Sequence, residues 1–268
     1  IKYRKLTDSE TRDLLYEIMN DDLREEFEKN GNVDFSYEIS NLSRFRVNVF
    51  KHLAGLGGVF RAIPTRVSTL QELGLPPILK NLARQRKGLI LVTGPTGSGK
   101  STTLAAMVDF INNERKGHII TIEDPIEYVF DHVDGSLISQ RSVGRDVDSF
   151  ADGLKYGLRQ DPDVMLVGEI RDQQTAQIAL SAAETGHLIF ATMHTRDAKG
   201  AISRIADLFP QSNPFEIRSQ LAFALRAVIS QHLLPSCIAG EKRELALEVL
   251  LNTLPIAAAI RTGKIESI

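Results

Sequence analysis

Residues 94–101, GPTGSGKS, restrict the possible folds of this chain more than any other segment. They match the pattern G-x-x-x-x-G-K-[ST] and directly follow the apolar run GLILV at residues 88–92. Glycines let the backbone curl so that successive N–H groups face a phosphate, and a helix that begins near Lys100 adds the positive end of its dipole. We therefore predict a phosphate-binding loop for ATP, in which Lys100 reaches the β- and γ-phosphates and Ser101 ligates Mg²⁺.

The alternative, a flexible glycine turn, is disfavoured because a strand-like run precedes the segment and a helix-like run follows it. The residues predicted to contact the nucleotide are Gly94, Pro95, Thr96, Gly97, Ser98, Gly99, Lys100, Ser101 and Thr102.

Apolar runs at residues 89–93, 118–122, 164–167 and 188–193 alternate with helix-like segments. Such alternation is typical of an α/β domain with a parallel sheet. We assign this domain to residues 75–268, after a linker at residues 64–74 where prolines and glycines interrupt any regular periodicity.

Residues 1–63 are predicted to form a separate, small α+β domain. Thr7 and Glu10 have the spacing of a capping box, and a helix is expected from Asp8 to Asn20. Two alternating runs at 44–50 and 58–63 surround a glycine-containing segment, which is typical of a β-hairpin. A register in which paired position numbers sum to 107 would place Arg46 opposite Arg61.

The composition excludes several classes of function. The 34 acidic and 32 basic residues nearly cancel, so no overall field favours nucleic acid or an anionic membrane. Cys237 is the only cysteine, which excludes an internal disulfide and a multi-cysteine zinc site and fits a reducing cytoplasm. The sequence contains no signal peptide pattern and no run of about eighteen apolar residues, so we expect no membrane-spanning segment.

A phosphate-binding loop needs a carboxylate beyond the phosphates, and two strand ends offer one. Glu169 follows the apolar strand 164–167, with Gly168 where a metal-binding Asp is usual, and we predict that Glu169 is the general base. The alternative is a solvated glutamate at the start of a helix near Asp172. Glu123 ends a second strand before Asp124 and Pro125, and it is the candidate to hold Mg²⁺ through water, with a plain turn as the alternative.

Two histidines, His187 and His194, flank the strand 188–193. A single histidine in such a place is more often structural than catalytic, and the separation exceeds the i, i+4 spacing of a helical metal pair. We predict no metal site here. His194, at the carboxyl end of the strand, is the candidate sensor of the γ-phosphate.

Four segments together resemble the motifs of the secretion ATPases. GPTGSGKST, TIEDPIEY at 121–128, LVGEIRD at 166–172 and GHLIFATMHT at 186–195 are similar to that family's Walker A, Asp box, Walker B and His box, in its order and spacing. RFRVNV at 44–49 and FPQ at 209–211 are similar to the branch of type IV pilus retraction ATPases, the PilT-like proteins.

This resemblance implies a homo-hexameric ring of subunits, each with a PAS-like domain followed by a RecA-like P-loop core. The family's Walker B usually lacks the metal-binding Asp, so Gly168 agrees with it and supports Glu169 as the base. Arg46 and Arg61 correspond to arginines that reach a nucleotide bound by a core domain, and we expect them to act on the neighbouring subunit's nucleotide. The family's chains extend beyond both ends of this sequence, so we expect both domains to be incomplete.

The resemblance also implies an inner-membrane pilus platform protein and, through it, pilin as partners, with the ATPase in the cytoplasm at the membrane face. A single cysteine excludes the four-cysteine zinc module of pilus-extension and type II secretion ATPases, which favours retraction. The retraction-linked stretch AIRNLIRE corresponds to residues 255–262, which keep only Ile256, Ile260 and Arg261. An extension or secretion ATPase therefore stays an alternative, ahead of a nucleic-acid translocase or a non-hydrolysing nucleotide switch.

Overall fold

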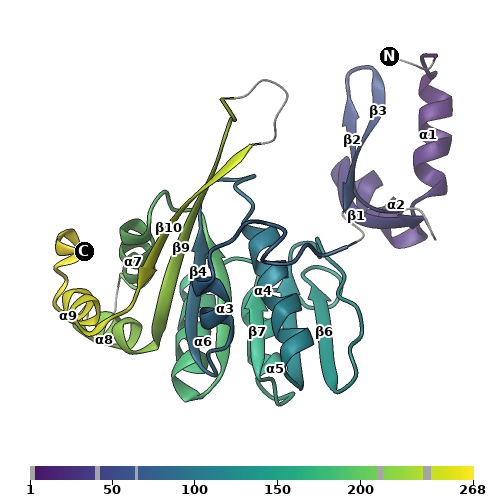
Figure 1. The fold of residues 1–268 in the computed structure, drawn as a ribbon. Helices are drawn as coiled ribbons and strands as arrows, with labels where there is room; N and C mark the ends of the chain where they lie inside the picture. The colour runs from purple at the N-terminus through teal and green to yellow at the C-terminus, as the bar shows by residue number, and fades with distance from the viewer. Residues whose placement is uncertain (1–3, 40–42, 64–65, 211–213, 238–242) are drawn as a thin grey trace. The chain divides into compact units, whose positions relative to one another are not determined.

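The computed structural model describes residues 4–39, 43–63, 66–210, 214–237 and 243–268. The chain consists of two compact units, Ile1–Arg66 and Val67–Ile268, and Figure 1 labels most of their helices and strands. The boundary between the units falls in the segment for which we predicted a linker. Each unit is described below by itself.

The N-terminal unit begins with helix α1, Asp8–Glu17. The predicted capping box is present, because the Thr7 side chain accepts from the Glu10 backbone and the Glu10 side chain accepts from the Thr7 backbone. The predicted end at Asn20 is wrong. The Asn20 side chain instead caps a second helix, α2, Asp21–Asn30, which the sequence analysis did not predict.

Three antiparallel strands complete this unit in the order β1-β2-β3. They are β1 (Asn32–Ile39), β2 (Ser43–His52) and β3 (Gly55–Ile63). The hairpin of β2 and β3 is tighter than predicted, because only Leu53 and Ala54 separate the two strands. Arg46 pairs with Arg61 in the register, which confirms the pairing whose position numbers sum to 107. The strand β1 was not predicted.

The C-terminal unit contains a seven-stranded sheet in the order β10-β9-β4-β8-β7-β5-β6. Its strands are β4 (Gly88–Thr93), β5 (Gly117–Glu123), β6 (Ser136–Ser142), β7 (Val164–Val167), β8 (Leu188–Met193), β9 (Leu225–Leu234) and β10 (Glu244–Leu251). All neighbours pair in parallel except β9 and β10. The predicted α/β fold class is confirmed, and four strands lie where apolar runs predicted them; β6, β9 and β10 were not predicted.

Helices cover both faces of this sheet (Figure 1). Side chains alternate along β4, so that Ile90 and Val92 belong to one hydrophobic cluster and Leu89 and Leu91 to the other. The first cluster includes α3 (Ile78–Ala83) and α4 (Lys100–Glu114). The second includes α5 (Phe150–Gly157), α6 (Gln173–Thr185), α7 (Ala198–Asp207), α8 (Pro214–Ala224) and α9 (Leu254–Thr262), with the short 3-10 helix Ile265–Ser267 beside it.

No helix among the described residues is both long and apolar enough to cross a membrane. The parallel strands β4, β5, β7 and β8 all end at the same edge of the sheet. Ligands bind outside this carboxyl edge in open α/β sheets, so the residues that follow these four strands form the candidate site.

Candidate active site

The predicted phosphate-binding loop connects β4 to α4, so the expected strand before it and helix after it are both present. Gly94, Gly97 and Gly99 have φ angles of 140°, 77° and 90°, which disfavour any residue with a side chain. A Cβ at Gly94 would lie 2.3 Å from the backbone oxygen of Gln231, so this glycine also permits a close approach of β4 and β9. The loop therefore curls as a nest of backbone groups at the N-terminus of a helix, which suits an anion.

Lys100 is buried at the base of this loop. Its ammonium group donates to the carbonyl oxygens of Gly94 at 2.8 Å and Pro95 at 3.0 Å. Burial lowers the pKa of Lys100, while the carboxylates of Glu169 and Glu127 act in the opposite direction. The ammonium is thus held inside the loop that we predict to receive phosphates, and two carboxylates lie near enough to influence it.

The next two residues of the loop differ in their surroundings. Ser101, the predicted magnesium ligand, is exposed in the first turn of α4. The hydroxyl of Thr102 lies 2.9 Å from the Tyr128 hydroxyl. Thr102, which we predicted to contact the nucleotide, thus binds the segment that follows β5.

Glu169 follows β7, and its side chain is 14% exposed. Its carboxylate accepts from the Arg171 guanidinium at 2.7 Å and lies 3.4 Å from the His194 ring. The cap of α6 is Asp172, whose side chain accepts from the Thr175 backbone, so Glu169 does not cap that helix. The side chain is therefore fixed between two cationic or donor groups at the sheet edge.

Gly168 precedes this carboxylate where a metal-binding Asp is usual, and packing accounts for the glycine. A Cβ here would lie 3.1 Å from the Phe150 ring and 3.3 Å from the Ile122 carbonyl oxygen. The Gly168 N–H donates to that same oxygen at 2.8 Å. A side chain here would therefore crowd the Phe150 ring and the end of β5.

Glu123 ends β5 and is largely enclosed. It accepts from the Thr121 hydroxyl at 2.6 Å and from the Gln140 amide at 3.4 Å, and burial raises the pKa of its carboxyl. Asp124, the next residue, is exposed. Glu127 was not singled out from the sequence, although it influences Lys100; only its position within IEDPIEY hinted at a role.

The two histidines that flank β8 differ in their environments. His187 packs against α6, with its ring 3.2 Å from the Ala182 carbonyl oxygen, as a structural histidine would. His194 follows the other end of β8 and contacts Glu169. The structure thus brings together Lys100, Glu169 and His194, which the sequence separates.

Arg46 and Arg61 lie in the N-terminal unit, on the same face of the hairpin because they are directly paired. Arg61 is exposed and Arg46 is half-buried, whereas Arg44 contacts Glu38 at 3.6 Å. Like charges directly opposite each other destabilise a sheet. An anion between the two guanidinium groups would relieve this repulsion.

The donor set fits Mg²⁺ as this ion is usually bound with nucleotides. Among the described residues, no group of three or more His, Cys, Asp or Glu side chains could hold a metal ion. Mg²⁺ rarely needs such a cage, because it is bound by one or two protein oxygens together with waters and substrate phosphates. The Ser101 hydroxyl and the Glu123 carboxylate are oxygen donors of this kind.

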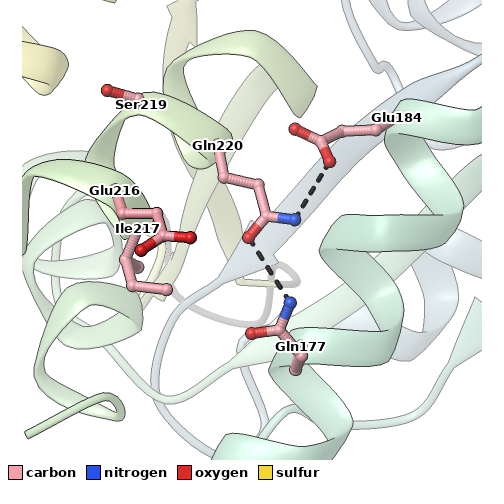
Figure 2. Close-up of a pocket in the computed structure, with 6 residues that line it drawn as sticks. All are labelled: Gln177, Glu184, Glu216, Ile217, Ser219 and Gln220. Carbon is pink, nitrogen blue, oxygen red and sulfur yellow. Dashed lines mark hydrogen bonds between the residues drawn. The ribbon is translucent and has the colours of Figure 1, made fainter. Parts of the chain in front are cut away.

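A separate surface pocket of about 480 Å³ lies between α6 and α8. Figure 2 shows the Gln220 side chain between Glu184 and Gln177, to which it is hydrogen-bonded. The lining residues are Gln177, Glu184, Glu216, Ile217, Ser219 and Gln220. None of them is a residue of the predicted site, so this pocket is distinct from the phosphate-binding loop.

Comparison with known proteins gives concordant similarities. The family described as type II/IV secretion system protein matches residues 23–261. The chain is 48% identical over 252 residues to the type IV pilus retractation ATPase PilT of Pseudomonas aeruginosa, covering 94% of this chain and 72% of that protein. It is 46% identical over 268 residues to a twitching motility protein of Neisseria gonorrhoeae, covering 100% of this chain and 71% of that protein. A crystal structure of the pilus retraction motor PilT with bound ADP is similar with a TM-score of 0.91 and 48% identity, over 96% of this chain and 74% of that chain.

Proposed function

Because this chain belongs to the type II/IV secretion system protein family, we propose that it is a motor ATPase that hydrolyses Mg-ATP to retract type IV pili. The observation that supports this most directly is the sheet edge itself. There the phosphate-binding loop, Lys100, Glu169 and His194 meet in a chain that is 48% identical to a pilus retraction ATPase. The protein hydrolyses ATP and binds its nucleotide at this edge.

Each residue of the site has its own role in ATP hydrolysis. The loop N–H groups and Lys100 bind the phosphates, and Glu169 takes the proton of the attacking water. Ser101 ligates Mg²⁺ directly and Glu123 holds it through water, and the ion when bound neutralises charge on the β- and γ-phosphates. His194 contacts Glu169 and senses the γ-phosphate through that contact.

The working form is a homo-hexameric ring with sites between subunits. Arg46 and Arg61 of one subunit face the γ-phosphate that the next subunit binds. Their opposed register supports this role, because two guanidinium groups directly opposite each other on one face favour an anion between them. Hydrolysis then depends on the position of the N-terminal domain, as the conversion of ATP energy into movement requires.

The partners are those of the pilus machinery. The ring acts from the cytoplasm on an inner-membrane platform protein and, through it, on pilin at the filament base. Nucleic acid is not a partner, since the net charge of −2 provides no basic field. One observation favours the alternative of an extension or secretion ATPase: α9 has Ala257 and Ala258 where the retraction stretch has polar side chains, and Thr262 where it has an acid.

Deletion of the gene tests the direction of work. A strain without it is expected to keep its surface pili but to lose retraction, because assembly would continue without removal of pilin. Fluorescently labelled pili followed by microscopy measure both properties, and the wild-type gene in trans is the control. Loss of pili, rather than loss of their retraction, would identify an extension ATPase instead.

Replacement of Lys100 by alanine should weaken ADP binding about 10- to 100-fold, since a charge-assisted hydrogen bond contributes roughly 1.5–3 kcal/mol. Isothermal titration with ADP measures the change. Lys155→Ala is the matched control, because Lys155 is an exposed lysine of α5 in the same unit. Unchanged ADP affinity in Lys100→Ala would contradict the assignment of the phosphate site to this loop.

A further inference from the structure

We propose that Gln231 is a positioning residue for ATP binding, which holds one peptide of the phosphate-binding loop so that its N–H faces the phosphates. The inference rests on the proposed ATPase function and adds a residue from β9, a strand outside the four recognised motifs. Gln231 is 1% exposed. Its amide group donates to the Ser98 carbonyl oxygen at 3.4 Å.

The sheet order brings Gln231 to the loop. β9 is the parallel neighbour of β4, and Thr93 pairs with Ser230, so the next residue of each strand lies at the same level. These next residues are Gly94, the first of the loop, and Gln231. A Cβ added to Gly99 would lie 3.7 Å from the Gln231 amide nitrogen, which places the side chain across the loop from its first to its last glycine.

The geometry of the peptide explains how the contact between Gln231 and Ser98 affects phosphate binding. In a trans peptide the C=O and N–H groups point in opposite directions. Because the Ser98 carbonyl points to Gln231, the Gly99 N–H of the same peptide points away from Gln231. This N–H belongs to the group of donors at the start of α4 that face an anion.

A second contact fixes the preceding peptide in the same way. The Arg243 guanidinium, just before β10, donates to the Gly97 carbonyl oxygen at 3.4 Å. The N–H of that peptide, on Ser98, donates to the Pro95 carbonyl oxygen at 3.2 Å. Gln231 of β9 and Arg243, which precedes β10, thus hold consecutive carbonyls of the loop, and Gln231 is the buried member of this pair.

The amide oxygen of Gln231 indicates that this side chain contributes more to nucleotide binding than to the stability of the fold. Among the described residues, its Oε1 atom is buried and has no hydrogen-bond partner. A buried oxygen without a partner costs free energy, and an apolar side chain of the same shape would avoid this cost. The reverse amide orientation would turn an oxygen toward the Ser98 carbonyl oxygen, so the donor must face the loop.

Gln231→Met separates positioning from structure, because methionine has a similar shape but neither donates nor accepts strongly. Loss of one neutral hydrogen bond weakens binding about 3- to 10-fold. The KM for ATP and the Kd for ADP should rise by the same factor, with kcat within about twofold of wild type. The melting temperature should stay equal or rise, whereas a merely structural residue would lower it and leave KM unchanged.

Two further variants complete the test. Gln231→Glu keeps the shape but turns a carboxylate toward the Ser98 carbonyl oxygen, so ADP binding should weaken more than in Gln231→Met. Gln85→Met is the matched control: Gln85 is an exposed glutamine that donates to a backbone carbonyl of α3, and it precedes β4, whereas the loop follows the other end of that strand. It should bind ADP as wild type does.

The outcomes distinguish this inference from the function on which it rests. Wild-type protein that neither binds ADP nor hydrolyses ATP would contradict the proposed ATPase. Wild-type activity together with unchanged ADP affinity in Gln231→Met would contradict the positioning role alone. A lower melting temperature with unchanged KM would reassign Gln231 to structure.

Discussion

A mixture of two inactive variants, Arg46→Ala/Arg61→Ala and Glu169→Gln, is expected to regain ATP hydrolysis once their subunits exchange. The reason is geometric. If the arginines act on the neighbouring subunit's nucleotide, some mixed interfaces pair intact arginines with an intact Glu169. If they act within their own chain, every site in a mixed ring lacks one component.

The expected effect is large. An arginine that stabilises the charge of a transferring phosphoryl group contributes roughly 10³ to 10⁵ in rate, so the double variant alone should lose most of its turnover. Steady-state ATPase activity across mixing ratios measures the rescue, which should reach its maximum at intermediate ratios. Either variant by itself should stay inactive at every concentration.

Two controls make the result specific. A chain with all three substitutions, mixed with Glu169→Gln, contains no intact base and should show no rescue. Arg4→Ala/Arg12→Ala removes two exposed arginines of the same unit that form ion pairs with Glu10 and Glu28, and it should keep its activity. Absence of rescue in the main experiment, with subunit exchange shown by labelled chains, would end the assignment in trans.

The second large effect concerns the general base. Glu169→Gln should lower hydrolysis about 10²- to 10⁴-fold, because an amide cannot take the proton of the attacking water. ADP binding should change little, since glutamine keeps the shape and can still accept from Arg171. Single-turnover hydrolysis and isothermal titration measure the two quantities separately.

Glu114→Gln is the control for this change, because Glu114 is also a carboxylate paired with an arginine, Arg84, but lies at the end of α4. It should hydrolyse ATP normally. Near-normal turnover in Glu169→Gln would refute its role as the base.

A parallel titration distinguishes the two carboxylates of the site. Glu123→Gln should raise the Mg²⁺ concentration needed for half-maximal activity, whereas Glu169→Gln should leave this concentration unchanged. The opposite pattern, with turnover lost in Glu123→Gln at any Mg²⁺ concentration and a shifted Mg²⁺ requirement in Glu169→Gln, would exchange their roles.

The sequence alone predicted those parts of the fold that depend on near neighbours in the chain. The glycine turn between a strand and a helix followed from residues 94–101, and β4, β5, β7 and β8 followed from apolar runs, because strands buried on both faces contain few polar residues. The α/β fold class and the resemblance to pilus retraction ATPases are also confirmed. Both could be predicted because the motifs are contiguous segments in a fixed order. Even the Arg46–Arg61 pairing was accessible, since a tight hairpin fixes its register locally.

Local signals were insufficient where competing contacts decide the structure. The apolar face at residues 14–19 predicted one helix to Asn20, but Arg24 binds the Tyr16 carbonyl and Asn20 caps the next helix, so the first ends at Glu17. β6 was missed because SLISQRS contains polar residues that pair with the end of β5, such as Gln140. These contacts involve other segments of the chain, so the pattern within one segment does not predict them.

Only the tertiary structure decided which residues of the site touch. The sequence placed Glu169 and His194 at strand ends, but the order of β7 and β8 in the sheet brings them to 3.4 Å. Gln231 is 133 positions from Ser98 and belongs to a strand that the sequence analysis missed. Hydrophobic periodicity indicates that a segment is a strand, but the neighbour of that strand is decided by how all the apolar faces are buried at once, and the contacts around the phosphates depend on that choice.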